Sequence, residues 1–302
     1  MKMKRIMTVL TVILVMSLTL VACGGDNSNG NNANDANNNT NEPTEQNKVA
    51  GADLQDGTYT LEESDFDENG WKVFMEVTVE DGKITSSNYN YENADGQLKT
   101  DDEEYQEMMK DKTGVGPQEF VKQLNDNLVA TQDAQLVDIV TGATHSSEAF
   151  LNYAQQLIQA AQNGDTETIT IQNTAALQDG EYALAEKNIG STGWKVIMDM
   201  TVTDGEITEV DYNYLNEEDQ LKTVDDEYQE LMTEKSGTGP QDYIPELNEN
   251  LIATQDPAEV DIVTGATHSA EVFKLYAAQL VNAAQKGDTD QIIVDNFVYE
   301  SD

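Results

Sequence analysis

Polar and apolar residues alternate with a period of two in three segments after Leu54. These segments are residues 58–62, 71–79 and 84–91, and the Asp81-Gly82 pair between the last two is a typical hairpin turn. Alternation of this kind predicts strands that bury one face. The pattern therefore predicts three antiparallel strands at the start of a folded domain.

Apolar residues further along the chain recur every three or four positions, which is typical of amphipathic helices. Residues 101–112 begin with acidic side chains, residues 117–128 begin with a proline, and residues 147–162 carry a regular apolar face. Residues 166–171 alternate again and predict a closing strand. Strands, then helices, then one strand indicate an α+β domain. The positions predicted to face the core from the two longer helices are Phe120, Leu124 and Leu128, and Phe150, Ala154, Leu157 and Ala161.

The whole pattern occurs twice. Trp71 and Thr144 recur as Trp194 and Thr267 at one constant offset, and no gap is needed between the copies. A unit of this length is the size of a domain and is too long for a solenoid repeat. We therefore predict two tandem α+β domains, residues 54–172 and 177–296, each with an antiparallel sheet and helices. The connection between them is so short that the domains are expected to lie close together.

The first 53 residues have a different composition. Three basic residues precede an apolar run, residues 7–20, which is short for a transmembrane helix and predicts a secretory signal over residues 1–22. The sequence Leu-Val-Ala-Cys that ends at Cys23 resembles a bacterial lipobox, so cleavage before Cys23 would allow lipid attachment there. A secretory signal with a chance cysteine is the alternative. Residues 23–53 are rich in asparagine and poor in large apolar side chains, which predicts a disordered linker behind the lipid anchor.

Composition limits the class of partner. The 302-residue chain has 57 acidic and 16 basic side chains and a formal net charge of −41. This charge argues against nucleic acid as a partner and against electrostatic binding to anionic membranes, whereas it favours cations, including metal-ion electron acceptors. Cys23 is the only cysteine, so no disulfide can form within one chain.

One nine-residue segment carries the candidate chemistry and occurs in both copies. Residues 138–146 read Asp-Ile-Val-Thr-Gly-Ala-Thr-His-Ser, and residues 261–269 repeat them. Each segment runs from β-branched residues through a turn with one glycine into a predicted helix. A helix N-terminus favours an anionic group, because it presents unpaired backbone N–H groups and the positive end of the helix dipole. The hydroxyls placed to carry such a group belong to Thr144 and Thr267.

This segment resembles the acceptor motif of FMN-binding domains, in which Asp is followed three residues later by Thr or Ser and then by Gly-Ala-Thr. In that family a flavin transferase esterifies the last threonine with the phosphate of FMN. The resemblance covers roughly residues 54–296 and implies two covalent FMN groups, one on Thr144 and one on Thr267. Related domains belong to sodium-pumping and Rnf-type redox complexes. The chain lacks the Glu-Thr-Pro-Gly segment that those subunits carry before the motif, so the resemblance leaves open which groups contact the flavin ring.

The resemblance, combined with the predicted lipid anchor, implies an electron carrier on the extracellular face of the cell membrane. Its donor would be a membrane reductase linked to quinol or NADH, and its acceptors would be extracellular species such as ferric iron. Tandem flavin lipoproteins of Gram-positive bacteria have this organisation. A carrier of this kind needs no shaped substrate site, and no acid–base or nucleophilic constellation is evident in the sequence. A surface adhesin or ligand-binding lipoprotein without flavin is the alternative.

Several neighbours of the acceptor threonines have expected roles. Glycine and alanine before each threonine leave room for the transferase. Asp138 and its counterpart either cap the turn or bind the transferase's metal ion, and Thr141 and its counterpart are expected to hydrogen-bond locally. His145 either contacts FMN or is simply half-exposed in the first helical turn. The predicted cofactor-binding residues are Thr144, Thr267, Asp138, Thr141, Gly142, Ala143, His145, Asp261, Thr264, Gly265, Ala266 and His268.

Aromatic residues and one lysine recur at matching places outside the acceptor segments. The aromatic side chains are predicted to pack in the core, with stacking on a flavin as the second interpretation. Lys99 and Lys222 are predicted to lie at the surface, with neutralisation of FMN as the second interpretation. The aromatic residues are Trp71, Tyr89, Tyr91 and Tyr105, and their counterparts Trp194, Tyr212, Tyr214 and Tyr228.

Two glycine-containing segments allow more than one interpretation. Residues 114–117 and 237–240 either form a backbone rim around the flavin or simply open the next helix. Residues 65–76 match the spacing of an EF-hand loop, but strands flank them and the second copy lacks the carboxylates. We therefore predict a hairpin loop there.

Overall fold

The computed structural model describes residues 47–300. The predicted signal, Cys23 and most of the asparagine-rich segment lie outside the described residues. Residues 47–300 belong to one compact unit that contains both copies of the pattern, which we call repeat 1 and repeat 2. None of the helices within residues 47–300 combines the length and apolarity needed to cross a membrane.

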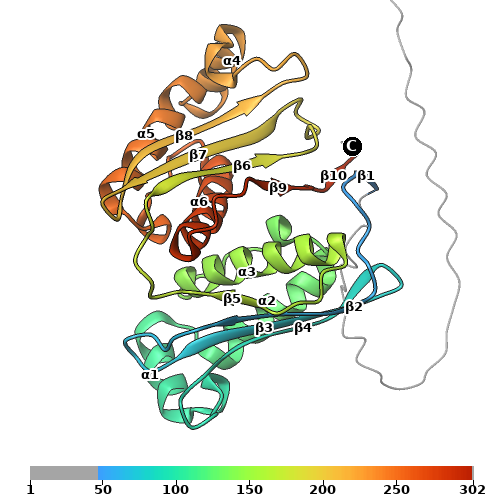
Figure 1. The fold of residues 1–302 in the computed structure, drawn as a ribbon, viewed down its shortest axis with the longest axis vertical. Coiled ribbons are helices and arrows are strands. Elements are labelled where there is room, and N and C mark those ends of the chain that lie inside the picture. The colour runs from blue at the N-terminus through green and yellow to red at the C-terminus, as the bar shows by residue number, and fades with distance from the viewer. Residues whose placement is uncertain (1–46, 301–302) are drawn as a thin grey trace, which may run out of the picture. The chain divides into compact units, whose positions relative to one another are not determined.

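Repeat 1 is built on a four-stranded sheet with the order β4-β3-β2-β5 (Figure 1). The three predicted strands pair antiparallel, and the closing strand β5 pairs parallel with β2 at one edge. Asp81 and Gly82 both have positive φ, 52° and 72°, as a tight hairpin turn between β3 and β4 requires. The strands are β2 (Gly57–Glu63), β3 (Lys72–Glu80), β4 (Lys83–Glu92) and β5 (Ile169–Ile171).

Helices α2 and α3 cover one face of this sheet (Figure 1). Every position predicted to face the core from these helices is fully buried, which confirms the core-facing side of each helix. Helix α3 begins at Thr144, three residues earlier than predicted. The helices are η1 (Lys99–Asp101), α1 (Glu103–Thr113), α2 (Pro117–Thr131), η2 (Ala134–Leu136) and α3 (Thr144–Asn163), of which η1 and η2 are short 3-10 turns.

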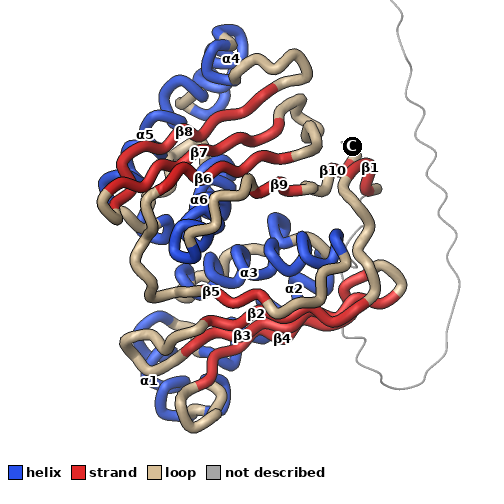
Figure 2. Tube along the Cα trace, in the orientation of Figure 1, coloured by secondary structure: helices blue, strands red, loops and turns tan. Residues whose placement is uncertain are grey.

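Repeat 2 reproduces this arrangement with its own sheet, β8-β7-β6-β9, and its own core (Figure 2). Each repeat is therefore an α+β domain with an independent hydrophobic core, as predicted. The elements are β6 (Gly180–Glu186), β7 (Lys195–Thr203), β8 (Glu206–Leu215), η3 (Lys222–Val224), α4 (Asp226–Ser236), α5 (Pro240–Thr254), η4 (Pro257–Glu259), α6 (Thr267–Lys286) and β9 (Ile292–Val294).

A small additional sheet joins the segment before repeat 1 to the segment after repeat 2. Strand β1 (Lys48–Ala50) pairs antiparallel with β10 (Val298–Tyr299). The prediction that residues 23–53 are disordered was therefore wrong for the last part of that segment, which includes β1. A polar segment that cannot build its own core becomes ordered here because a distant strand supplies its hydrogen-bond partners.

Helices α3 and α6 form the contact between the repeats. Gln159 donates a hydrogen bond of 3.1 Å to Gln279, and Gln156 donates one of 3.1 Å to Asn282. Gln159 and Asn282 are equivalent positions in the two repeats, and so are Gln156 and Gln279. If each residue is replaced by its equivalent in the other repeat, the first of these hydrogen bonds becomes the second. The contact is therefore symmetric, and an approximate two-fold axis relates the repeats. The short connection predicted close domains, and these bonds confirm the contact.

Candidate functional site

Thr144 and Thr267 are the first residues of α3 and α6, and both are exposed. The cap positions are Ala143 and Ala266, and no side chain caps either helix. Within residues 47–300 neither threonine hydroxyl has a hydrogen-bond partner. Neither threonine hydroxyl therefore caps its helix, and both residues remain exposed.

The backbone at both helix starts leaves N–H groups without an intrahelical partner. The first helical bonds run from Ser147 N to the Ala143 carbonyl and from Ala270 N to the Ala266 carbonyl, both 2.9 Å. The N–H groups of the three residues before each donor are not used by the helix. Each acceptor threonine thus lies at a site suited to an anion.

The glycine of each turn is required by its conformation and by its surroundings. Gly142 and Gly265 have φ of 86° and 85°, which favours glycine. A Cβ on Gly142 would lie 2.5 Å from the Thr113 carbonyl oxygen, and one on Gly265 would overlap the Ser236 carbonyl oxygen. The turns therefore pack directly against the loops that precede α2 and α5. This contact places the predicted glycine rims beside the acceptor turns.

The two turns differ in one hydrogen-bonded side chain. Ser147 accepts a bond of 3.0 Å from Val140 N and donates one of 2.9 Å to the Ala143 carbonyl. Ala270 occupies the equivalent position in repeat 2 and cannot form these bonds. The acceptor turn of repeat 1 is therefore held by two bonds that repeat 2 lacks.

The polar residues of the turns are exposed, whereas Ala143 and Ala266 are buried and the two glycines are intermediate. Among residues 47–300 no hydrogen bond is formed by the side chains of Asp138, Thr141, Asp261 or Thr264, so the expectations of a turn cap and of local bonding by threonine were wrong. The His145 side chain is 69 % exposed, and its Nε2 lies 3.9 Å from Glu259 of repeat 2.

A cavity of about 620 Å³ lies beside Thr267, within the usual size range of ligand pockets. Aromatic side chains from four different elements or loops converge on it, together with one lysine. The residues that define this cavity in repeat 2 are Glu186, Trp194, Tyr214, Lys222, Tyr228, Tyr243, Thr267 and His268.

The lysine is enclosed by aromatic rings. The Nζ of Lys222 lies 4.0 Å from the ring centroid of Tyr214, 4.7 Å from that of Tyr228 and 5.5 Å from that of Trp194. Repeat 1 has the same arrangement around Lys99, with Tyr91, Tyr105 and Trp71 at 4.1, 4.7 and 5.5 Å. We call these two clusters the lysine boxes.

Both lysines are only 6 % exposed, so the prediction of surface placement was wrong. The aromatic faces attract the ammonium and cover its aliphatic stem, which makes burial feasible. Burial nevertheless lowers the pKa of Lys222 to about 8. Burial also lowers the pKa of Lys99, although the carboxylates of Asp67 and Glu63 act against that shift.

A pair of tyrosines connects each lysine box to the acceptor helix. The hydroxyls of Tyr214 and Tyr212 are 2.6 Å apart, and Tyr212 donates a bond of 3.3 Å to the Ser269 carbonyl in the first turn of α6. Repeat 1 has the same connection through Tyr91, Tyr89 and Ser146. Core packing is confirmed for six of the eight aromatic residues, because Tyr89 and Tyr212 are fully buried and Trp71, Tyr91, Trp194 and Tyr214 are buried in the same two cores. The aromatic residues of the box around Lys222 also line the cavity.

A buried carboxyl group, which sequence reasoning missed, also lines the cavity. Glu186 accepts bonds of 2.7 Å from Val196 N and 2.7 Å from the Tyr276 hydroxyl. Burial raises its pKa. Glu63 has the equivalent bonds in repeat 1, to Val73 N and Tyr153. A glutamate at the end of an alternating strand gives no signal of burial, because its partner tyrosine comes from a distant helix.

The other repeat completes this cavity. Asp133, Gln135 and Leu136 of repeat 1 line it, as do residues 296–300 after β9. Tyr299 in this last segment donates a bond of 3.2 Å to Asp133. The site beside Thr267 is therefore built from both repeats and from the C-terminal strand.

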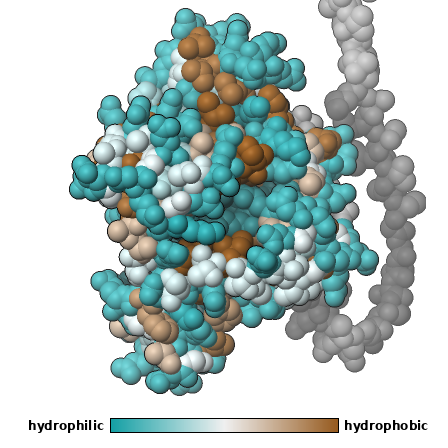
Figure 3. Space-filling view, in the orientation of Figure 1, coloured by the Kyte–Doolittle hydropathy of each residue, from teal (hydrophilic) through white to brown (hydrophobic). Residues whose placement is uncertain are grey.

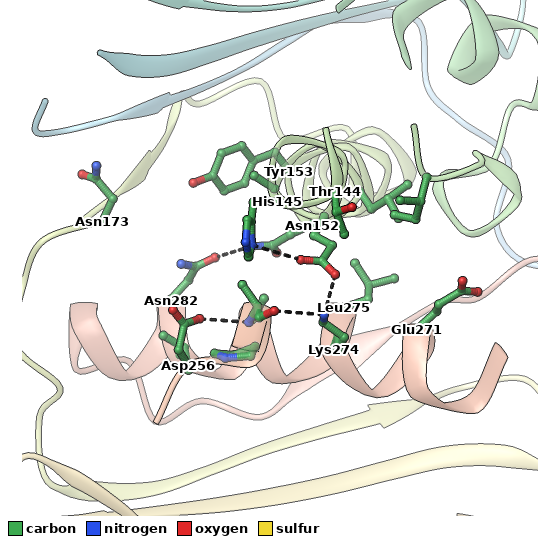
Figure 4. Close-up of a pocket in the computed structure, with 18 of the residues that line it drawn as sticks. Thr144, His145, Asn152, Tyr153, Asn173, Asp256, Glu271, Lys274, Leu275 and Asn282 are labelled. Carbon is green, nitrogen blue, oxygen red and sulfur yellow. Dashed lines mark hydrogen bonds and ion pairs between the residues drawn. The ribbon is translucent and has the colours of Figure 1, made fainter. Parts of the chain in front are cut away.

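A second cavity, of about 320 Å³, begins at Thr144 and runs between α3 and α6 (Figure 4). His145 points into it, and Lys274 of repeat 2 forms an ion pair of 2.5 Å with Glu148 there (Figure 4). Lys274 also donates a bond of 3.0 Å to the Ala258 carbonyl. Both acceptor threonines thus open onto cavities at the contact between the repeats.

The segment with EF-hand spacing forms the loop between β2 and β3, as predicted. Asp67 accepts bonds from the backbone N–H groups of Asn69 and Trp71, so its carboxylate shapes the turn. Within the part of the chain that the structure describes, no three acidic or histidine side chains are grouped as a metal site.

Comparison with known proteins identifies the two repeats. A family model described as an FMN-binding domain matches residues 70–159 and residues 193–282, which together make up more than half of the chain. The chain belongs to the FMN-binding domain family. The matched segments contain both acceptor turns and both lysine boxes, so the family is represented twice, in tandem.

Relatives of known sequence or structure each correspond to part of the chain. A 15 kDa lipoprotein of Treponema pallidum (strain Nichols) is 40 % identical over 116 residues, which is 38 % of this chain and 82 % of the relative. A crystal structure of a Clostridium perfringens protein is 38 % identical with a TM-score of 0.39, and covers 40 % of this chain and 98 % of its own. A solution structure of a Clostridium thermocellum protein is 27 % identical with a TM-score of 0.25, and covers 36 % of this chain and 92 % of its own.

Proposed function

We propose that this protein is a membrane-anchored extracellular electron carrier with two covalent FMN groups, attached through phosphate esters to Thr144 and Thr267. The observation that carries the proposal is the placement of each threonine. Both are exposed, without a hydrogen-bond partner among the described residues, and located at the first position of a helix. An FMN-binding domain with such a threonine in each repeat supports attachment at these two places.

The residues present fit a phosphate ester. Esterified phosphate keeps a negative charge, and the unused N–H groups and dipole of the following helix stabilise that charge by up to about 1 kcal/mol when exposed. The preceding glycine and alanine bring no bulky side chain near the hydroxyl. The exposed carboxylate of Asp138 or Asp261 lies in the same segment and would help the transferase hold its metal ion.

The residues present also fit a flavin ring. Flavin supplies electron storage at the end of the phosphate linkage when bound. Trp194, Tyr214 and Tyr228 provide flat apolar surfaces for an aromatic ring. Lys222 provides a positive charge at the same cavity, where burial raises the pKa of the neighbouring Glu186. This combination suits a large aromatic ligand that carries negative charge.

The anchor and the charge support the role as a carrier. The Treponema relative is named a lipoprotein, and the lipobox-like sequence at Cys23 supports the same attachment here. A tethered flavin is retained where a dissociable one would be lost to the medium. The face drawn in Figure 3 is mostly hydrophilic. The net charge of −41 favours the approach of cationic acceptors such as ferric species.

The intact mass of the mature protein, co-expressed with a flavin transferase, tests this proposal. We expect two added FMN groups, and we expect Thr144→Ala and Thr267→Ala each to remove one of them. Thr166→Ala is a control, because it removes an exposed threonine hydroxyl of repeat 1 that lies outside the acceptor turn, and it should leave both groups in place. Retention of both flavins by both acceptor variants would show that the assignment is wrong. A colourless protein from the native host would favour the adhesin alternative.

A further inference from the structure

We propose that Lys99 and Lys222 supply the positive countercharge for the electron that each flavin ring retains on reduction, and that they thereby raise its reduction potential. This inference rests on the proposed attachment of FMN to Thr144 and Thr267. It assigns the lysine boxes a role in setting the potential, beyond the binding of the cofactor.

Neither buried ammonium group has a carboxylate within ion-pair distance among the described residues. Lys222 and Lys99 are 6 % exposed, yet within residues 47–300 no carboxylate lies at ion-pair distance from either Nζ. Lys274 is similarly buried, at 8 %, and has both Glu148 and a carbonyl oxygen as partners. An unpaired buried charge destabilises the folded state, and the chain has 57 acidic residues that could have paired with it. We therefore infer that a bound anionic ligand supplies the counterion of each lysine.

The charge of Lys222 faces the cavity beside Thr267. Lys222 lines the cavity beside Thr267, and aromatic rings hold its Nζ without neutralising it. The tyrosine pair connects the box to the Ser269 carbonyl, two residues after the acceptor threonine. The ammonium is therefore fixed within the cavity that a ligand on Thr267 would enter. Lys99 does not line the cavity described at Thr144, and its role is assigned because repeat 1 has the same box and the same connection to its acceptor helix.

Reduction changes the charge of a flavin ring. Uptake of two electrons from the proposed membrane reductase and of one proton from water would leave the ring with one additional negative charge. No bond to the protein forms or breaks, and the lysine keeps its proton. A fixed ammonium in a dry cavity stabilises the reduced ring more than the neutral oxidised ring. The phosphate has the same charge in both states, so pairing with the phosphate alone would leave the potential unchanged.

The test uses full-length chains with one flavin each. In the Thr144→Ala background only the flavin on Thr267 remains, and we expect Lys222→Met to lower its midpoint potential while Lys99→Met leaves it unchanged. The Thr267→Ala background should reverse this pattern. Each tenfold loss of preference for the reduced flavin corresponds to about 30 mV for a two-electron couple. Met keeps much of the stem volume, and Lys286→Met controls for loss of one exposed charge.

A second readout uses the protein without flavin. There the ammonium has no counterion, so Lys222→Met should make the unloaded protein more stable to denaturant. A less stable unloaded variant would show that the aromatic rings alone stabilise the buried ammonium group of Lys222, which contradicts the inference. Attached flavin with an unchanged potential would also overturn it and leave the attachment proposal intact. Absence of flavin mass in the parent chain would instead refute the attachment itself.

Discussion

Gln135 of repeat 1 donates a hydrogen bond of 2.7 Å to the Tyr276 hydroxyl of repeat 2. Tyr276 in turn donates a bond of 2.7 Å to Glu186, which lines the cavity beside Thr267. A side chain from one repeat thereby orients the buried carboxyl group of the other. The position equivalent to Gln135 in repeat 2 is Ala258, which has no side-chain donor. Among the residues that the structure describes, repeat 2 therefore makes no equivalent hydrogen bond to Tyr153 of repeat 1.

Replacement of Gln135 by alanine should lower the free energy of unfolding by about 1 kcal/mol, because one partly buried hydrogen bond is lost. The fold accommodates alanine at this position, as Ala258 demonstrates. Urea denaturation checks the value, and Gln123→Ala on the exposed side of α2 is the control. Equal effects of the two substitutions would contradict a specific role for the bond.

Replacement of Gly142 by alanine should destabilise the protein more than replacement of Gly114. Both glycines have positive φ, 86° and 87°, so each substitution introduces strain of about 1 kcal/mol. Nothing lies within 4 Å of a Cβ on Gly114, whereas a Cβ on Gly142 meets the Thr113 carbonyl. The additional clash should cost about 1–3 kcal/mol more. It should also reduce flavin attachment at Thr144 but not at Thr267, which intact mass would reveal.

The ion pair between Glu148 and Lys274 should show strong energetic coupling. Its side chains are 18 % and 9 % exposed, so removal of one partner leaves a largely buried charge at a cost of about 3 kcal/mol. The double variant Glu148→Gln with Lys274→Met should recover much of this loss. Leu151, the counterpart of Lys274, shows that the fold accepts an apolar side chain there. Additive single effects in a denaturation cycle would argue against the coupling.

The stability of the unloaded protein should rise with pH above about 8. Burial lowers the pKa of Lys222 to about 8 from its ordinary value of 10.5. Between these values the unfolded chain binds more protons than the folded one, so deprotonation favours folding. The tyrosines that face Lys222 do not contribute below pH 10, because burial raises the pKa of Tyr214 and of Tyr228.

Denaturation between pH 8 and 10, compared for the parent and Lys222→Met, measures this contribution. The variant should lack part of the rise, and Lys99→Met should remove a further part, because burial lowers that pKa as well. Identical slopes for the parent and both variants would mean that neither lysine is desolvated in solution.

The sequence by itself determined the features that depend on neighbouring residues. Alternation and three-to-four spacing predicted the strands and helices, because these periods decide which side chains share a face. The Asp81-Gly82 turn and the acceptor segment were equally readable, since the positive φ of Gly82 and Gly142 is a local requirement that glycine meets. The tandem duplication then followed from direct comparison of the two halves.

Only the tertiary structure decided which polar groups lose their water. Lys222 has an ordinary polar neighbourhood in the sequence, and it is buried because Tyr214 and Tyr228 come from other elements to enclose it. Glu186 is buried for the same reason, through Tyr276 of α6. Strand β1 is ordered only because β10 reaches it from the far end of the chain. The burial of a polar side chain and the pairing of a strand depend on contacts between residues that are far apart in the sequence. Local sequence patterns do not specify those contacts.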